Sequence, residues 1–474
     1  MKEIMVIGSG IIGSFIAHEL SQYDVHVTIV EKHHDICEEV SAANSAIVHA
    51  GYDPEEGTLK GRLNKRGADM YPSICKQLHV DYVKCGAIVA ACGEEEEKEL
   101  ETLYQRAVRR NIDVTFLTRQ EILQREPNIS EAVTKAMDVP STAVITPWEV
   151  CNALLDECLL NACDIKLGEK VIDVKKEDNV ICVTTTKGTY QVDMLINAAG
   201  IGAQRVMEMI EENPLFHITP KRGQYFILSK RAKGFVNEII YPVPTKVGKG
   251  VLAIPTVHGN TLLGPNSELE MDEDTSTTSE GLASVKEKLS KTLTNVPYQE
   301  VIHTYSGLRP TGNDNDFFCE YSKASKQIIH CACIDSPGLA SAPAIGEYVV
   351  NEFVLPAMNL KRKAKYQHRM VQERMQDKSL TEKQELIKHN KAFGHIICRC
   401  EEISEQEVVD CIHRPCGARS IKGVKKRVRP GMGKCQGGFC EIEVARILAR
   451  ELNIPLEEVP YDGETYFEVS KGVR

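Results

Sequence analysis

EIMVIGSGIIGSFIAHEL, residues 3–20, contains the most informative pattern for the fold of this chain. Its apolar residues 4–7 predict a strand, and three glycines then lead into a helix with an apolar face. Gly8 permits a tight turn, Gly10 lets a pyrophosphate approach the backbone, and Gly13 allows close contact between helix and strand. The N-terminus of such a helix attracts phosphate groups. The stretch therefore predicts a phosphate-binding strand–turn–helix unit.

The next segment supplies the second half of a dinucleotide fingerprint. VHVTIVEK, residues 25–32, predicts another apolar strand, which ends at Glu31. An acidic residue about 20 residues beyond the glycines accepts hydrogen bonds from a ribose. A glycine pattern alone could mark an ordinary helix start, but both strands and the acid stand in register here. They favour a dinucleotide site in a Rossmann-like α/β domain.

A segment far along the chain bears on the choice between FAD and NAD. No second glycine fingerprint follows a strand, so we expect a single dinucleotide. Residues 328–354 predict a strand, a glycine turn and a helix that starts with small residues. At Gly338, Ala340 and Ser341 a flat ring could lie against the helix N-terminus, whose dipole stabilises the negative charge of a reduced flavin. Ordinary tight helix packing would give the same pattern.

Length and composition limit the class of protein. The chain has 474 residues, 42% of them hydrophobic, which is enough for several domains, and 17 cysteines. Its net charge of −10 argues against nucleic acid as the main partner. We find no apolar run long enough for a transmembrane segment and no secretion signal at the start. We therefore expect a cytoplasmic protein whose thiols serve as metal ligands or core residues.

Four cysteines near the end have the spacing of a metal site. Cys398 and Cys400 are separated by one residue, and Cys435 and Cys440 stand in the glycine-rich RPGMGKCQGGFC, residues 429–440. Two thiol pairs can supply four thiolates to an iron–sulfur cluster, and glycines let backbone amides point at the sulfurs. Zinc is the rival, but its pairs usually have two to four intervening residues. An iron–sulfur cluster is therefore favoured over zinc.

Residues 41–71, SAANSAIVHAGYDPEEGTLKGRLNKRGADMY, resemble the flavin-crossing segment of the D-amino-acid-oxidase-like FAD superfamily. The nearest branch holds L-2-hydroxyglutarate oxidase and the large subunit of anaerobic glycerol-3-phosphate dehydrogenase. The resemblance continues to about residue 355 through MLINAAGIGA (194–203), KRGQYFIL (221–228), IIYPVPT (239–245), PTVHGN (255–260) and SGLRPTGNDNDFF (306–318). It implies FAD as the cofactor. By this resemblance the residues near the FAD also include Ser45, Val171, Ala198, Ala199, Gly200 and Leu339.

The resemblance also implies a division into domains, with an α/β (α+β overall) fold. We expect an FAD-binding domain that is interrupted by a mixed-sheet substrate domain, then a charged linker and a small helical metal-binding module. The expected parts are residues 1–80, 147–216 and 307–358 for FAD, 81–146 and 217–306 for substrate, 359–394 for the linker and 395–474 for the module and tail. The linker is expected to be a solvated helix.

Five residues are candidates for the chemistry of substrate oxidation. Removal of a hydride needs a base for the accompanying proton, and an anionic substrate needs a cation. Arg309, in GLRP, matches the superfamily's substrate-anion arginine, although a structural ion pair is the alternative. His49 and His258 are each candidates for the base or a hydrogen-bond donor, or are structural. Tyr241 and Arg222 are expected in the pocket wall.

Two departures from the resembling families carry predictions. Aerobic glycerol-3-phosphate dehydrogenases have an arginine where this chain has Asp53, and a carboxylate there would repel a phosphate. Sarcosine oxidases attach their flavin to a cysteine where this chain has Gly307. We therefore expect noncovalent FAD, and a crossing segment closer to the hydroxyglutarate type.

The cysteine module resembles the bacterioferritin-associated-ferredoxin-like [2Fe–2S] domain, which implies a [2Fe–2S] cluster on Cys398, Cys400, Cys435 and Cys440. The other two cysteines of the module, at 411 and 416, are expected to be structural. With FAD, a cluster and no NAD site, electrons would pass to an electron-accepting flavoprotein or ferredoxin-like partner subunit. The predicted activity is a dehydrogenase of a small anionic substrate, with glycerol 3-phosphate first. The alternatives are L-2-hydroxyglutarate or another 2-hydroxy acid, a secondary amine, and a non-catalytic electron-transfer scaffold.

Overall fold

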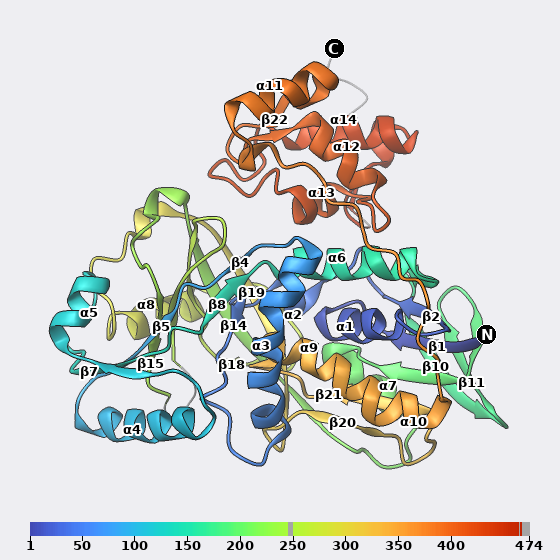
Figure 1. The fold of residues 1–474 in the computed structure, drawn as a ribbon, viewed down its shortest axis with the longest axis horizontal. Helices are drawn as coiled ribbons and strands as arrows, with labels where there is room; N and C mark the ends of the chain where they lie inside the picture. Colours follow the sequence, from blue (N-terminus) through green and yellow to red (C-terminus); the bar gives the residue numbers. More distant parts are fainter. Residues whose placement is uncertain (245–249, 464, 467–474) are drawn as a thin grey trace.

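The computed structural model describes residues 1–244, 250–463 and 465–466. Within them, a six-stranded sheet has the order β20-β21-β13-β1-β2-β9 and is parallel except for β20 (Figure 1). Its strands are β1 (Lys2–Ile7), β2 (Val25–Val30), β9 (Cys163–Lys166), β13 (Met194–Asn197), β20 (Phe318–Tyr321) and β21 (Ile328–Ala332). Parallel strands need covered faces, and near-continuous apolar runs such as IMVI in β1 supply the buried surface. The predicted Rossmann-like α/β fold is confirmed.

Helices cover this sheet and bring distant segments together. Helix α1 (Ile11–Leu20) packs against α6 (Pro147–Leu160) and α9 (Gly338–Val349), and α9 packs against α3 (Leu59–Leu78). These helices and the sheet share one apolar core. The N-termini of α1 and α9, which lie more than three hundred residues apart in sequence, belong to neighbouring helices that cover the same sheet. A small antiparallel sheet of β10 (Val171–Glu177), β11 (Val180–Thr185) and β12 (Thr189–Val192) stands beside it.

A second large sheet, which we call the cap sheet, forms the other half of the main body. Its path within the described residues is β18-β14-β17-β16-β15-β5-β7-β6, and β19 pairs with β14. The strands are β5 (Ala87–Ala91), β6 (Thr115–Leu117), β7 (Lys135–Asp138), β14 (Ile218–Leu228), β15 (Ile239–Pro242), β16 (Leu252–Pro255), β17 (Thr261–Gly264), β18 (Glu268–Leu269) and β19 (Val301–Gly312). Helices α4 (Glu94–Arg109) and α8 (Ser279–Leu289) flank it. The domain limits stay a prediction, and the predicted limit at 306–307 falls inside the continuous strand β19.

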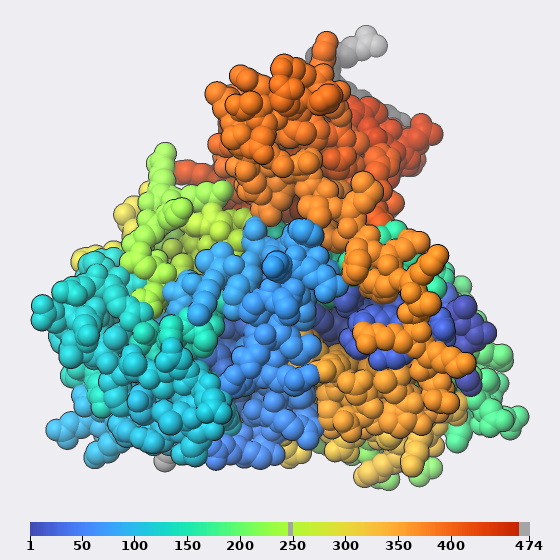
Figure 2. All heavy atoms as spheres, viewed as in Figure 1, coloured from blue at the N-terminus to red at the C-terminus, as the bar shows by residue number. Residues whose placement is uncertain are grey.

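The C-terminal module, residues 395–463, sits over α6 (Figures 1 and 2). It contains β22 (Ile396–Cys398), β23 (Ile403–Ser404), α12 (Glu405–His413), α13 (Ile421–Val428) and α14 (Glu441–Leu452). These elements enclose an apolar core of their own. Ser404 and Glu407 form a capping box that starts α12, as the Ser-x-x-Glu pattern predicts.

The segment between the main body and the module differs from the expected solvated helix. Only α11 (Leu380–His389) is a regular helix, and residues 361–374 run extended across the surface of the main body. Glu157 of α6 accepts hydrogen bonds from Tyr366 and His368, and Arg369 donates to the carbonyl oxygen of Leu78. These contacts hold the first part of the segment as a strap, because extended backbone can follow a surface that a helix would leave. No helix in the described part of the chain is long and apolar enough to cross a membrane.

Candidate functional site

A cavity of about 820 Å³ is lined by residues of both large sheets. Its walls are formed by the loop after β1, the end of β2, the first turn of α9 and the facing strands of the cap sheet. Of the predicted cofactor residues, the lining includes Gly8, Gly10, Glu31, Ser45, Val171, Ala198, Ala199, Gly200, Gly338 and Leu339. Gly13, Ala340 and Ser341 lie behind this lining, in the packing between α1, α9 and their neighbours.

The glycines of the first turn leave no room for side chains. Gly8 has a φ of +99°, and a Cβ atom there would lie 2.6 Å from the carbonyl oxygen of Ala198. A Cβ on Gly13 would lie 2.0 Å from the carbonyl oxygen of Gly8, so helix and strand touch directly. One on Gly10 would lie 2.8 Å from Ser41 Oγ, which accepts a hydrogen bond from the first amide of α1. Gly8 and Gly13 therefore have the geometric reasons that the sequence pattern predicts, while Gly10 makes room for Ser41, and its predicted role toward a pyrophosphate stays a prediction.

Glu31 is fixed at the end of β2, at the edge of the cavity. Its Oε2 atom accepts hydrogen bonds from the backbone N–H and the hydroxyl of Ser9, at 2.9 and 2.8 Å. Its Oε1 atom accepts from the backbone N–H of His33 at 2.9 Å. A carboxylate offers about four acceptor positions, so one remains for a ribose hydroxyl. The contacts hold this carboxylate in one orientation at the cavity.

The paired strands β14 and β19 carry two cross-strand pairs, one of two cations and one of two tyrosines. Lys221 lies opposite Arg309, and Tyr225 lies opposite Tyr305. Lys221, Tyr225 and Arg309 line the cavity. A Cβ atom on Gly223, between Lys221 and Tyr225, would lie 2.5 Å from Arg309 Nη2, so the missing side chain makes space for the guanidinium. The pairing thus brings two positive charges to one wall of the cavity.

The tyrosines secure the crossing segment to the cap sheet. Their rings stack with centroids 4.6 Å apart. The hydroxyl of Tyr225 shares a hydrogen bond of 3.0 Å with Ser45 Oγ, and Tyr305 donates to the carbonyl oxygen of Asn44 at 2.8 Å. Ser45 therefore holds the cap sheet against the cofactor side of the cavity.

Arg222 lies outside the cavity, contrary to the expectation that it forms a wall. Side chains alternate along a strand, so Arg222 faces away from its neighbour Lys221. Its guanidinium pairs with Glu270 at 2.9 Å and Asp274 at 3.2 Å. It is a buried structural cation on the far face of β14.

The two candidate histidines occupy different surroundings. His49 lines the cavity, and its Nδ1 atom shares a hydrogen bond of 3.0 Å with the hydroxyl of Tyr241, another lining residue. Burial raises the pKa of Tyr241, so its hydroxyl stays protonated. His258 does not line the cavity; its Nε2 lies 3.2 Å from Thr146 Oγ1 and 3.4 Å from Glu149 Oε1. Of the two, only His49 can meet a ligand in the cavity.

The four predicted metal-ligating cysteines come together as two pairs. The sulfur atoms of Cys400 and Cys435 are 3.8 Å apart. Two thiolates that bind one tetrahedral metal with metal–sulfur bonds of about 2.3 Å are separated by about the same distance. Cys398 and Cys440 form a buried hydrogen-bonded pair. A Cβ atom on Gly433 would lie 2.2 Å from the Cβ of Cys400, so this glycine permits the loops to meet. No group of three or more His, Cys, Asp or Glu in the described chain is arranged to hold a single metal ion.

The surroundings of Cys398 favour its thiolate form. The hydrogen bond from Cys440 lowers the pKa of Cys398, although burial acts in the opposite direction. Backbone N–H groups of Gly431, Glu401 and Cys400 also point at this sulfur and lower the pKa further. Amides directed at a sulfur stabilise a ligating thiolate. Cys411, by contrast, bonds the carbonyl oxygen of Val408 within α12, as a structural thiol does.

Comparison with known proteins agrees with both halves of this site. Residues 3–352 match the family described as FAD dependent oxidoreductase, and residues 396–450 match the BFD-like [2Fe-2S] binding domain. The chain belongs to the FAD-dependent oxidoreductase family. It carries the [2Fe–2S]-binding domain at its C-terminal end, and its cofactors are FAD and a [2Fe–2S] cluster.

Three relatives illustrate how far the similarity extends. Glycerol 3-phosphate dehydrogenase of Caloramator mitchellensis is 40% identical over 98% of this chain and 97% of its own length. L-2-hydroxyglutarate dehydrogenase of Escherichia coli K12 is 28% identical over 57% of this chain and 64% of its own length. The structure of L-alpha-glycerophosphate oxidase from Mycoplasma pneumoniae with FAD bound is 27% identical, with a TM-score of 0.73, over 77% of this chain and 98% of that one.

The cavity fits a noncovalently bound FAD. A Cβ atom at Gly307 would lie 2.0 Å from the carbonyl oxygen of Ala43, so the position of the attachment cysteine in sarcosine oxidases can hold no side chain here. Cys333 does line the cavity, but burial raises its pKa to about 12, which makes its thiol a poor nucleophile. FAD should therefore be released on acid or heat denaturation. Absorption spectra of supernatant and pellet measure this; flavin that stays with the precipitated polypeptide would contradict it.

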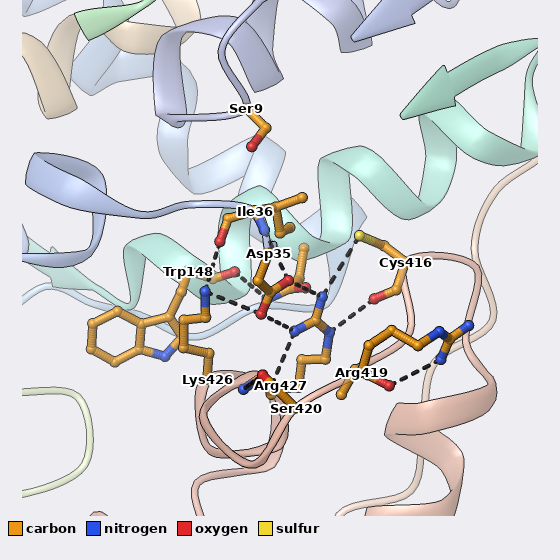
Figure 3. A network of polar contacts seen from close by, with 12 residues as sticks. Ser9, Asp35, Ile36, Trp148, Cys416, Arg419, Ser420, Lys426 and Arg427 are labelled. Carbon is orange, nitrogen blue, oxygen red and sulfur yellow. Dashed lines mark hydrogen bonds and ion pairs between the residues drawn. The ribbon is translucent and has the colours of Figure 1, made fainter. Parts of the chain in front are cut away.

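Buried ion pairs attach the module to the FAD-binding segment that follows β2 (Figure 3). Arg427 of α13 donates two hydrogen bonds to the carboxylate of Asp35, at 2.8 and 2.9 Å. Lys426 Nζ lies 2.8 Å from the carbonyl oxygen of Ile36 and 2.5 Å from Glu38 Oε1. Burial alone would raise the pKa of Asp35, but the charges of Arg427 and Lys426 hold it well below its ordinary value. Glu38 also lines the cofactor cavity, so the module contacts the cavity wall directly.

A second contact fixes the orientation of the module. Asp156 of α6 accepts hydrogen bonds from Arg414 Nε at 2.9 Å and from the backbone N–H of Cys416 at 2.8 Å. Loss of one partner from a buried ion pair costs about 3–5 kcal/mol, because the other charge stays buried. Two such contacts on different elements hold the module in one position over the FAD-binding domain.

Proposed function

We propose that this chain is a glycerol-3-phosphate dehydrogenase, which oxidises the secondary alcohol of glycerol 3-phosphate to the ketone. The observation that supports this most is the 40% identity to the Caloramator mitchellensis enzyme over 98% of this chain, which includes both the cofactor cavity and the cysteine module. The alcohol carbon gives up a hydride and the hydroxyl gives up a proton, so two electrons leave each substrate molecule. FAD, when bound, accepts electron pairs, and a [2Fe–2S] cluster carries single electrons.

The two cations on the cavity wall suit a phosphate. Arg309 and Lys221 lie opposite each other on paired strands, and both line the cavity. A phosphate carries up to two negative charges, and a guanidinium can bind two of its oxygens. The carboxylate of Asp53 argued against a phosphate substrate. Asp53 does not line the cavity, but its charge reaches the lining residue Tyr241, so the phosphate would have to bind at Arg309 and Lys221 rather than beside Tyr241.

His49 is our candidate for the base that takes the hydroxyl proton. It lies in the cavity wall, and the Tyr241 hydroxyl holds its Nδ1 atom. This hydrogen bond fixes the orientation of the ring at the cavity wall. A positioned base contributes about 10²–10⁴-fold to the rate of such a reaction.

L-2-hydroxyglutarate is the second candidate substrate. The observation in its favour is the 28% identity of 57% of this chain to the Escherichia coli L-2-hydroxyglutarate dehydrogenase. Carboxylates would meet the same two cations, Lys221 and Arg309. Addition of each compound without oxygen distinguishes the candidates, since only a substrate bleaches the flavin band. The set includes glycerol 3-phosphate, L-2-hydroxyglutarate, other 2-hydroxy acids, proline and sarcosine; a flavin that none of them bleaches would favour an electron-transfer scaffold.

Arg309→Ala should weaken substrate binding while FAD stays bound. Loss of a cation that faces a buried anion costs about 2–4 kcal/mol, so the apparent KM for glycerol 3-phosphate should rise about 30- to 1000-fold. Arg222→Ala is the matched control, because that arginine lies on the opposite face of β14 from Lys221; its loss should leave KM nearly unchanged. Equal KM values for Arg309→Ala and the unaltered enzyme would rule out this role.

We also propose that the electrons pass to a separate protein in the cytoplasm, either a flavoprotein or a ferredoxin-like partner subunit. The support is the single glycine fingerprint, which FAD would occupy, and the [2Fe–2S]-binding domain, whose cluster would carry single electrons.

A further inference from the structure

An aromatic side chain stands exposed on the loop that carries two of the cluster cysteines. Phe439 lies directly before Cys440 and is 84% exposed, which makes it the one exposed phenylalanine of the described residues. Ile442, at the start of α14, is 43% exposed. Exposed apolar side chains often mark interaction sites. Beside a redox group they indicate the surface at which a partner can approach that group most closely.

Cations flank both cysteine pairs. Arg399 directly precedes Cys400, Lys434 directly precedes Cys435, and both cations are exposed. The two carboxylates that follow Cys400 are engaged elsewhere. Glu401 pairs with Arg429 at 3.0 Å and with Lys230 at 3.1 Å, and Glu402 pairs with Lys383 at 3.8 Å.

The cap sheet contributes further cations to the same edge. The pair between Lys230 and Glu401 places the turn after β14, η2 (Lys230–Ala232), beside the cysteine loops. Arg231 and Lys233, next to Lys230, are exposed. In Figure 2 the module lies against the yellow-green part of the cap sheet that carries this turn. The apolar centre at Phe439 thus has cations from two parts of the molecule at its rim. The two carboxylates beside Ile442 are engaged, Glu443 with Arg446 and Glu441 with the hydroxyl of Tyr461.

We infer that Phe439 and this basic rim form the docking surface for a small electron-carrier protein with an acidic face; the inference rests on the proposed dehydrogenase function. The chain as a whole has a net charge of −10, so a local basic rim distinguishes this edge from the rest of the surface. Complementary charges steer transient partners and raise their association rate, while a small apolar centre permits fast release. Each encounter would transfer one electron from the reduced enzyme to the oxidised carrier.

The test uses two haem proteins of opposite charge as probes, acidic cytochrome b5 and cationic cytochrome c. The double variant Arg231→Glu plus Lys434→Glu should reduce cytochrome b5 at least tenfold more slowly than the unaltered enzyme at low salt, with a weaker salt dependence. It should reduce cytochrome c faster. Phe439→Ala should slow cytochrome b5 reduction at every salt concentration. Enzyme reduced by dithionite, with the excess removed, serves as the electron source, so the result does not depend on which substrate is correct.

Matched controls separate docking from general charge and from damage to the cluster. Lys326→Glu makes the same kind of charge change in the turn between β20 and β21, at the opposite end of the molecule (Figure 1), and Leu380→Ala removes a 73% exposed side chain from α11. Both should behave like the unaltered enzyme, and the visible absorption of the cluster should be equal in all variants. Rates for cytochrome b5 that are the same in the rim variants and the unaltered enzyme would overturn the inference. So would a dimer of the unaltered enzyme that Phe439→Ala dissociates, since a second copy would then occupy this surface.

Discussion

Cys435→Ser should separate the catalytic cycle into two halves. The substitution removes one thiolate of the Cys400–Cys435 pair, whose sulfurs lie 3.8 Å apart, so the visible absorption of the cluster should fall. Turnover with a protein acceptor should drop about 100-fold or more, since loss of even an outer partner of a metal ligand costs about 10- to 100-fold. FAD lies in a separate part of the fold, so substrate should still bleach the flavin band once. A two-electron dye that reaches the flavin directly should still be reduced.

The matched control for this experiment is Cys411→Ser. Cys411 is a buried thiol of the same module that bonds the carbonyl oxygen of Val408, and a serine hydroxyl can keep that bond. Its cluster absorption and its turnover should stay near those of the unaltered enzyme. Equal turnover by Cys435→Ser and the unaltered enzyme would make the module a structural element. Zinc, in place of iron and sulfide, in protein prepared without oxygen would contradict the assignment as well.

His49→Gln should slow flavin reduction by glycerol 3-phosphate about 10²- to 10⁴-fold, the usual contribution of a positioned base. A glutamine keeps the approximate size and a hydrogen-bonding group for Tyr241, but it cannot take a proton. Rapid mixing under anaerobic conditions measures this step without the acceptor. FAD content should stay the same, because we propose that the glycine turn and Glu31, and not His49, hold the nucleotide.

The comparison variant is His258→Gln. This histidine contacts Thr146 and Glu149 outside the cavity, so its loss should leave the rate of flavin reduction within about threefold of the unaltered enzyme while it lowers stability. A large loss of rate in His258→Gln together with a small one in His49→Gln would reverse the assignment.

Local sequence rules were sufficient to predict the glycine turn after β1 and the meeting of the two cysteine segments, while the cofactor roles of these residues stay predictions. The reason is that each depends on a short stretch of chain: the glycines at 8, 10 and 13 are required by contacts within or next to one turn. The two cysteine pairs come from short loops, although their meeting also needs Gly433. Such features carry their own signature because the backbone itself makes the site.

Features that depend on strand facing and long-range pairing were harder to predict. Arg222 is the residue expected in the cavity wall from the sequence, whereas the alternation along β14 puts Lys221, Gly223 and Tyr225 on the cavity face. The period of two along KRGQYFIL could have identified Lys221, given that the opposite strand places Arg309 beside it. No local signal indicates which of the two faces meets the cavity, since this depends on how the sheet packs.

The ion pairs that attach the C-terminal module to the main body could not be predicted from local sequence patterns. Lys426 and Arg427 lie in the basic helix α13, and Asp35 and Glu38 lie in the loop between β2 and α2 (Glu39–Ala42). Their pairing joins residues almost four hundred positions apart, and only the packing of α13 against α6 brings them together. The extended strap at 361–374 has the same origin, because Glu157 and the backbone of α3 override its helical composition.

We propose that glycerol 3-phosphate delivers electrons to FAD and then to the C-terminal cluster. Stepwise anaerobic addition of glycerol 3-phosphate to the holoenzyme tests it, with flavin absorption and the electron paramagnetic resonance signal of the reduced cluster as simultaneous readouts. We predict that the flavin band bleaches and the cluster signal then appears, while L-2-hydroxyglutarate leaves both unchanged. A flavin that bleaches only with L-2-hydroxyglutarate, or a cluster that stays oxidised beside fully reduced flavin, would contradict the account.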